Sequence, residues 1–148
     1  DFLEEIKQVF ELDSLGEKKL NVLSKGQMQR VLIAFSLLFG SKAVFMDEPL
    51  FACEDYQKEY SLKYLKEFCS ATGKTVYISM HELDLTKKYA ETVMLFYPNH
   101  DIDLGTPEEV MTDEDLEKAY KIPVSMLKHS ETMTRNQIKE ESEMIKKL

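Results

Sequence analysis

Two acids directly after a short apolar run are the first residues whose types and spacing could do chemistry. The run Ala43–Met46 has turn signals on both sides, and Asp47 and Glu48 follow it. A buried strand that ends this way places carboxylates at the carboxyl edge of a parallel sheet, where open α/β sheets bind ligands. There one carboxylate can hold Mg²⁺ through water and its neighbour can deprotonate an attacking water. Strands also end in acids for solubility, so both interpretations stay open.

A second candidate is the segment Leu23-Ser24-Lys25-Gly26-Gln27, which opens a helix predicted over 27–39. Ser24 can cap this helix, and the N–H groups and positive dipole end of such a terminus bind phosphate readily. The alternative is an ordinary N-cap with a glycine for close packing.

A third candidate is His81, just past the predicted strand Thr75–Ser79. A histidine at a strand end beside acids could hydrogen-bond a terminal phosphate, although a lone histidine is more often structural. His100 and His129 have no ligand-like spacing to it, so we expect no metal site around His81.

The elements that must position these residues follow from hydrophobic periodicity and turn signals. The predicted helices cover residues 2–12, 27–39, 56–72 and 83–90, and the predicted strands cover 43–46, 75–79 and 92–97. This alternation implies an α/β fold with right-handed parallel crossovers. A small extra strand over 101–104 is expected next. A capping box at 106–109 then starts a short helix, and another helix covers 113–120.

Composition limits the class of protein. The 148 residues carry 19 basic and 27 acidic side chains, a net charge of −8, which argues against a nucleic-acid-binding surface built on net positive charge. The longest apolar run, Val31–Phe39, is too short to cross a bilayer. Two cysteines outside any CxxC pattern suggest free thiols in a reducing cytosol. The first residue is Asp1 rather than Met, so we expect a fragment of a longer chain.

The order and spacing of the three groups resembles the ATP-binding cassette (ABC) ATPase family. Leu23–Gln27, followed by Gln29-Arg30, looks like the ABC signature motif. Ala43–Glu48 with Pro49 looks like Walker B, and His81 looks like the switch histidine. The resemblance extends through Gly105–Val110, which is similar to the segment closing many importer ATPase domains.

The resemblance implies a role for each of these residues. Asp47 would hold Mg²⁺ through water, Glu48 would be the general base, and His81 would contact the γ-phosphate of ATP. The residues that would contact ATP bound by the opposite subunit are Ser24, Lys25, Gly26 and Gln27. Lys25 stands where a glycine is commoner and adds a positive charge near the phosphates. Glu54 stands at the usual D-loop aspartate, although Asp55 could slip into that role.

No Gly-x-x-x-x-Gly-Lys-Ser/Thr occurs in the sequence, so the Walker A phosphate cradle is absent from it. We therefore expect part of a P-loop NTPase-type parallel sheet with flanking helices, lacking the N-terminal Walker A half. Residues 1–125 would be the C-terminal part of a nucleotide-binding domain, with the end of the helical subdomain at 1–40 and the rear of the catalytic core at 41–125. Residues 126–148 would be a polar tail. Such a piece should bind ATP poorly, and its exposed strand edge should favour self-association.

The function that this resemblance implies is the ATP-hydrolysing subunit of an ABC transporter, with ATP and Mg²⁺ as cofactors. Its partners would be a second ABC ATPase subunit, most simply in a homodimer, and transmembrane permease subunits, with no nucleic acid. It would lie in the cytoplasm, peripheral to the cell membrane. The closing segment favours importers of iron chelate, haem or cobalamin, whereas the Ser-Lys-Gly signature also occurs in exporters. The alternatives are a soluble ABC ATPase of DNA repair or translation and a non-catalytic interaction module.

Overall fold

A computed structural model of the chain describes residues 1–127. The chain divides into two compact units, Asp1–Met80 and His81–Leu148. Most of the predicted tail at 126–148 lies outside the described residues.

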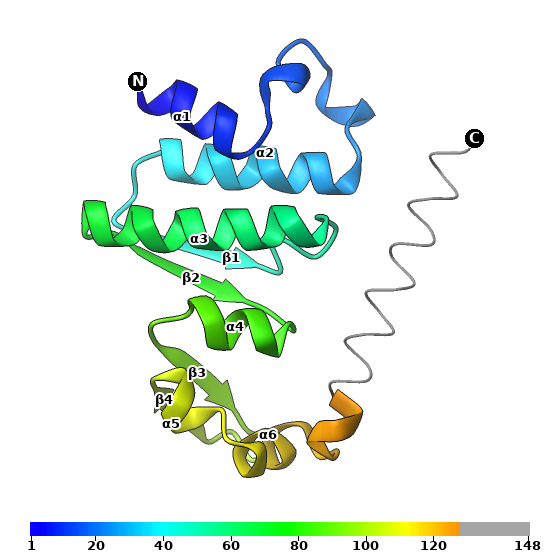
Figure 1. Cartoon of the computed structure of the whole chain (residues 1–148), viewed down its shortest axis with the longest axis vertical. Coiled ribbons are helices and arrows are strands. Elements are labelled where there is room, and N and C mark those ends of the chain that lie inside the picture. The colour runs from blue at the N-terminus through cyan, green and yellow to red at the C-terminus, as the bar shows by residue number, and fades with distance from the viewer. Residues whose placement is uncertain (128–148) are drawn as a thin grey trace. The chain divides into compact units, whose positions relative to one another are not determined.

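The first unit is a two-stranded parallel sheet with helices on one side. Its strands β1 (Ala43–Asp47) and β2 (Thr75–Ser79) pair in register from Ala43 opposite Thr75 to Asp47 opposite Ser79. Helix α1 (Phe2–Val9) contacts both α2 (Lys25–Leu38) and α3 (Asp55–Thr72). Helix α2 contacts β1 and α3 contacts β2, and Figure 1 shows the arrangement. Two 3₁₀ turns, η1 (Asp13–Leu15) and η2 (Leu20–Val22), connect α1 to α2. This arrangement confirms the predicted α/β class with a parallel sheet and flanking helices.

Local signals explain where the helices of this unit begin and end. Gly40 and Gly73 follow α2 and α3 with φ angles of +85° and +66°, the left-handed conformation that glycine adopts without steric cost. The helix predicted over 2–12 is shorter than expected and ends at Val9. Glu11 has a φ of +53°, which no right-handed helix can contain.

Apolar side chains from the three helices form the core of the first unit. Among the largest completely buried side chains of this unit, Ile6, Ile33 and Leu37 lie on α1 and α2, Phe10 directly follows α1, and Leu50 lies in the loop after β1. Val44 of β1 is buried as well, whereas its neighbour Phe45 is 76% exposed and stacks on Tyr77 of β2 with ring centroids 4.5 Å apart. One face of the sheet is therefore covered, and the other presents an aromatic pair to solvent.

The second unit combines a hairpin with short helices. Its two strands, β3 (Val93–Phe96) and β4 (Ile102–Gly105), pair antiparallel. The same unit contains three helices, α4 (Leu83–Tyr89), α5 (Pro107–Val110) and α6 (Asp113–Tyr120). The predicted capping box opens α5, where the N–H of Thr106 donates to Oε2 of Glu109 at 2.8 Å. The buried core of this unit consists of Leu83, Val93, Leu95, Val110, Met111, Leu116, Val124 and Leu127.

The predicted pairing of the third strand was wrong. Within residues 1–127, β3 joins β4 in a separate sheet and does not extend the parallel pair β1–β2. The connection from Tyr97 to Asp101 is short: the N–H of Tyr97 donates to the carbonyl of Asp101 at 3.0 Å, and His100 takes a φ of +71°. So short a link can join only antiparallel strands, because a parallel pair needs a crossover of a dozen residues or more.

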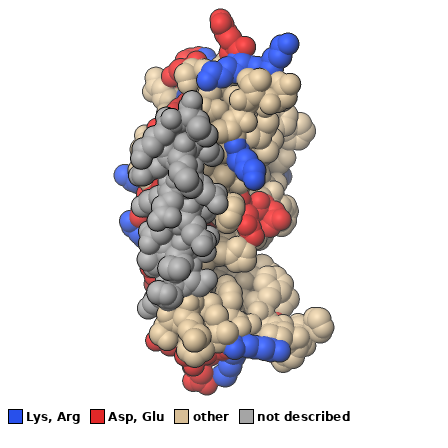
Figure 2. Space-filling view, turned by 90° about the vertical axis from the view of Figure 1, so that its right-hand side faces the viewer, with Lys and Arg blue, Asp and Glu red and all other residues tan. Residues whose placement is uncertain are grey.

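None of the helices described over residues 1–127 is long and apolar enough to span a membrane. On the described surface that Figure 2 shows, charged side chains stand in small separate groups with wide areas of other residues between them.

Candidate functional site

The carboxyl ends of β1 and β2 meet at one edge of the sheet. Asp47 ends β1 and is paired in register with Ser79, which ends β2. The Ser79 hydroxyl donates a hydrogen bond to Oδ1 of Asp47. The Asp47 side chain is exposed at this edge, so the predicted position of a carboxylate at the carboxyl end of a parallel sheet is confirmed.

Glu48 has an unusual backbone that is held from both sides. Its φ is +43°, a left-handed value that costs free energy in a residue with a Cβ and persists only where its surroundings impose it. The N–H of Glu48 donates to the carbonyl of Ser79 at 3.2 Å and to its Oγ at 3.0 Å. The carbonyl of Glu48 accepts the N–H of Phe51 at 3.3 Å. The backbone of the half-buried Glu48, and with it the direction of the Cα–Cβ bond, is therefore fixed by these bonds.

The segment before α2 forms a complete capping box. Oγ of Ser24 accepts the N–H of Gln27 at 3.2 Å, and Oε1 of Gln27 accepts the N–H of Ser24 at 3.0 Å. The predicted cap by Ser24 is confirmed, but the helix starts at Lys25 rather than at Gln27. Lys25 and Gly26 therefore belong to the first helical turn, where N–H groups point out of the helix end.

Gly26 packs directly against the loop after β1. A Cβ atom at Gly26 would lie 2.5 Å from the carbonyl oxygen of Ala52, so only glycine fits there without a shift. The close-packing interpretation of this glycine is thus confirmed. It is compatible with a phosphate contact from the same helical turn, because the Ala52 contact concerns the Cα of Gly26 and not its N–H.

Two residues of this region were not predicted as site residues. Gln29 spans the loop after β1, since its Nε2 donates to the carbonyl of Glu48 at 3.2 Å and its Oε1 accepts the N–H of Ala52 at 2.8 Å. Ser79 bonds to both Asp47 and Glu48. The sequence contains a weak signal for Ser79, a polar residue ending the next parallel strand, and none for the contacts of Gln29.

Arg30 fixes α2 against its neighbours. It is only 8% exposed, and its Nη1 donates to the carbonyl of Phe10 at 2.8 Å and to Oε2 of Glu11 at 2.6 Å. Glu11 also accepts the side chains of Tyr56 and Gln57 from the start of α3, at 3.1 Å and 2.7 Å. One carboxylate just after α1 thereby links the side chains of α2 and α3.

The remaining predicted residues lie at the start of α3 and of the second unit. Glu54 is the exposed N-cap of α3, and its N–H donates to Oε1 of Gln57 at 3.2 Å. Asp55 is the first residue of α3. His81 is exposed and opens the second unit, two residues after Ser79 in the chain. The structure thus brings Asp47, Glu48 and the signature-like segment together in one unit through Ser79 and Gln29.

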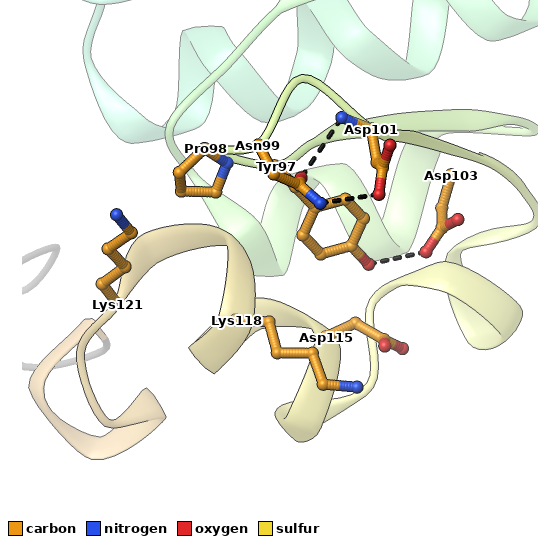
Figure 3. A pocket seen from close by; sticks show the side chains of 8 residues that line it. All are labelled: Tyr97, Pro98, Asn99, Asp101, Asp103, Asp115, Lys118 and Lys121. Carbon is orange, nitrogen blue, oxygen red and sulfur yellow. Dashed lines mark hydrogen bonds between the residues drawn. The ribbon is translucent and has the colours of Figure 1, made fainter.

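The second unit has an open polar pocket of about 570 Å³ that contains none of the predicted residues. Figure 3 shows its side chains, which are Tyr97, Pro98, Asn99, Asp101, Asp103, Asp115, Lys118 and Lys121. The hydroxyl of Tyr97 donates to Oδ2 of Asp103 at 2.6 Å. This bond to a carboxylate, helped by partial shielding from water and by the negative charge of Asp103, raises the pKa of Tyr97 to about 12.

The chemistry of the site fits part of a magnesium–nucleotide complex. Asp47 offers an exposed carboxylate, the hard oxygen ligand that Mg²⁺ prefers, and Mg²⁺ commonly keeps several waters and few protein ligands. Over residues 1–127, no three or more His, Cys, Asp or Glu side chains are grouped to hold a metal ion by themselves. A cation here would therefore depend on water and on the phosphates of a nucleotide for most of its ligands.

Comparison with known proteins identifies relatives of the chain. No family model matches it. Hemin import ATP-binding protein HmuV of Idiomarina loihiensis is 32% identical in an alignment of 126 residues that covers 81% of this chain and 48% of that protein. The energy-coupling factor transporter ATP-binding protein EcfA2 of Lactococcus lactis is 33% identical over 85% of this chain and 43% of its own length. The chain thus spans about half the length of these curated relatives.

Solved structures show the same fold. An inward-facing metal-chelate type ABC transporter superposes with a TM-score of 0.71 at 22% identity, over 82% of this chain and 48% of that one. A dimeric structure of a bacterial ABC transporter cassette has a TM-score of 0.57 at 29% identity, over 63% of this chain and 40% of that one.

Proposed function

We propose that this chain, which matches the C-terminal portion of ABC transporter ATP-binding subunits, supplies the signature segment, the Walker B carboxylates and the switch histidine of an ABC ATPase. The observation that carries the proposal is the edge where β1 ends. Asp47 and Glu48 lie there side by side, and Gln29 ties the Glu48 backbone to the helix that Ser24 opens. ATP-binding subunits of this family hydrolyse ATP, so we propose roles in ATP hydrolysis for the residues of this chain.

Each residue has a proposed part in hydrolysis. Asp47 binds Mg²⁺ through water, and the ion, when bound, neutralises phosphate charge. Glu48 accepts the proton of the attacking water, because its fixed backbone aims one carboxylate from the sheet edge. His81 hydrogen-bonds the γ-phosphate, and Glu54 acts in the D-loop next to the subunit interface.

The start of α2 is proposed to bind the ATP held by an opposite subunit. Ser24, Gly26 and Gln27 would donate to its phosphates from a helix N-terminus, where anions are favoured, and exposed Lys25 would add a positive charge. In such a head-to-tail dimer the donors assemble around the phosphate only when two subunits close. This ties hydrolysis to association, because proximity and orientation are then supplied by the dimer.

The proposed setting is a transporter. The partners are a second ABC ATPase subunit, most simply an identical one, and transmembrane permease subunits, with the ATPase peripheral on the cytoplasmic face of the membrane. Relatives named for import of hemin and petrobactin support an importer of iron chelates or haem, and the relatives also include phosphonate and energy-coupling factor transporters. Co-purification with a permease supports this setting, whereas co-purification with nucleic acid or ribosomes supports a soluble ABC ATPase of repair or translation.

The proposal is tested with Glu48→Gln in a polypeptide that contains this chain together with a Walker A motif. Turnover should fall by at least about 100-fold while MgATP binding measured by calorimetry persists, because the amide cannot accept the proton. Exposed Glu91→Gln is the matched control and should hydrolyse ATP normally. Unchanged turnover in Glu48→Gln would remove Glu48 from the role of base.

The chain itself provides a second test. Titration of MgATP into the 148-residue chain should give no saturable micromolar binding, because its sequence holds no Walker A motif. Saturable binding would reveal another phosphate site in the chain, and the proposal that the chain binds ATP poorly by itself would be wrong.

A further inference from the structure

Gln29 lies on α2 two residues after the signature-like segment, and its side chain hydrogen-bonds to the loop after β1. Its two amide atoms serve opposite ends of that loop. Nε2 donates to the carbonyl of Glu48 at 3.2 Å, and Oε1 accepts the N–H of Ala52 at 2.8 Å. One neutral side chain therefore bridges the two ends of the loop, as a donor at one end and an acceptor at the other, and we call this pair of hydrogen bonds the clasp.

The clasp acts on the residue proposed as general base. The Glu48 carbonyl accepts two donors, the N–H of Phe51 at 3.3 Å and Nε2 of Gln29, while the N–H of Glu48 is held by Ser79. A left-handed φ of +43° in a glutamate needs such contacts, because its intrinsic free energy is unfavourable. Of these contacts, only the one from Gln29 comes from the helix that carries the signature-like segment.

The first turn of α2 is in close contact with the same loop. Gly26 contacts the backbone of Ala52 so closely that no Cβ fits, and Sγ of Cys53 lies 3.9 Å from the carbonyl of Gly26. Movement of the α2 N-terminus would therefore displace Ala52 and, through Gln29, the carbonyl of Glu48. Packed backbone contacts transmit such shifts because they leave no space to absorb them.

We propose that Gln29 is a positioning residue that couples the N-terminus of α2 to the backbone of Glu48. The base is then aligned only while that helix end is packed against the loop after β1. This inference rests on the proposed function. It adds that contact between the signature-like segment and an opposite nucleotide is transmitted to the hydrolytic site of the same subunit. Gln29 itself would contact neither the attacking water nor the phosphates of ATP.

Two substitutions separate the two halves of the clasp. Gln29→Glu keeps an acceptor for the N–H of Ala52 but replaces the donor to Glu48 with a carboxylate oxygen. Gln29→Met removes both bonds at similar side-chain size. Gln8→Met, at an exposed position on α1, is the control.

The first readout is amide hydrogen exchange and carbonyl ¹³C shifts by NMR in the 148-residue chain. We expect the Ala52 amide to exchange about 10-fold faster or more in Gln29→Met and to be nearly unchanged in Gln29→Glu, since opening the bond exposes the N–H. The Glu48 carbonyl shift should move in both variants. Wild-type exchange at Ala52 in Gln29→Met would show that the clasp does not hold the loop and would overturn the inference.

The second readout is ATP hydrolysis in the polypeptide that includes a Walker A motif. Both Gln29 variants should lower kcat by about 10- to 100-fold with KM within about 2-fold, because misplacing a catalytic group by a fraction of an ångström acts on the chemical step. Normal kcat together with altered Ala52 exchange would make Gln29 merely structural and overturn the inference alone. Normal turnover in Glu48→Gln would instead remove the base, and the proposed function would fail with it.

Discussion

Gly26 lies so close to Ala52 that a Cβ atom on it would come within 2.5 Å of the Ala52 carbonyl oxygen. The first turn of α2 and the loop after β1 are therefore in backbone contact, with no side chain between them. This contact sets the distance over which Gln29 can bridge to Glu48. A glycine in this helix is thus required by packing rather than by its φ angle.

Gly26→Ala should destabilise the chain. The clash is with backbone, so α2 or the loop must move, and we expect a loss of about 1–3 kcal/mol in the free energy of unfolding, as for other overpacked sites. This loss should exceed the gain of about 1 kcal/mol that alanine brings to a helix. Urea unfolding followed by circular dichroism measures the difference.

Gly16 provides the matched control for that substitution. Nothing lies within 4 Å of a Cβ built on Gly16, and its φ is −57°. Gly16→Ala should therefore be neutral or stabilising by up to about 1 kcal/mol. Equal stabilities of the two alanine variants would contradict the backbone clash.

Arg30→Met should destabilise the first unit through loss of a buried hydrogen-bonding group. The substitution keeps the apolar stem but leaves the Phe10 carbonyl and Glu11 without the Nη1 donor. We expect a loss of about 1–3 kcal/mol in the free energy of unfolding, mainly because the buried Phe10 carbonyl loses its donor, since Glu11 is half exposed and keeps Tyr56 and Gln57. Lys7→Met, which removes the exposed ion pair with Glu4, should scarcely move the urea midpoint. Equal effects of the two substitutions would mean that Arg30 is not structurally important.

Local signals allowed the sequence to predict most of the elements around the site. Ser24 as a cap, Gly40 and Gly73 after helices, and the strands that carry Asp47 and Ser79 all depend on neighbours in the chain. Because parallel strands end at the same edge, the position of the Asp47 carboxylate also followed from the pattern.

Contacts that depend on tertiary packing could not be predicted from the sequence. The reach of Gln29 across the loop depends on how deeply α2 sits against Ala52, and no spacing rule encodes that depth. The predicted pairing of β3 was wrong because the apolar run 93–96 identifies a strand but not its partner. The short link that includes His100, with its left-handed backbone, accounts for the antiparallel pairing of β3 with β4. The left-handed Glu11 likewise shortened α1.

Self-association of the chain, expected from its exposed strand edge, is a further prediction. Besides that edge, the stacked pair of Phe45 and Tyr77 supplies an apolar surface, since Phe45 is 76% exposed on the uncovered face of β1 and β2. A second copy of this chain can bury that pair, and large exposed apolar side chains on sheets favour such contacts. Sedimentation velocity should show concentration-dependent dimers or larger species.

Phe45→Lys should weaken this association by placing a charge in the contact, whereas Leu20→Lys, at an exposed position on η2 and away from the sheet, should leave it unchanged. A wild-type chain that sediments only as monomer at high concentration would contradict the prediction.

Tyr97 should make stability depend on pH at the alkaline end. Its pKa is raised from 10.0 to about 12, first by the hydrogen bond to Asp103 and then by partial shielding from water and the charge of that carboxylate. Because the folded-state pKa lies above the ordinary value, folding favours the neutral phenol. Its contribution is fully present below about pH 10 and is lost as the pH rises through about 12.

Spectrophotometric titration of tyrosinate tests this bond directly. Tyr97→Phe should remove a component titrating near pH 12 and flatten the decline in stability between about pH 10 and pH 12. Asp103→Asn should instead shift that component to lower pH, because the neutral amide no longer penalises the phenolate. If the component removed by Tyr97→Phe titrated near the ordinary pKa of about 10 instead, the phenol would not be bonded to Asp103 in solution, and the β3–β4 link would be held by Asn99 and the main chain.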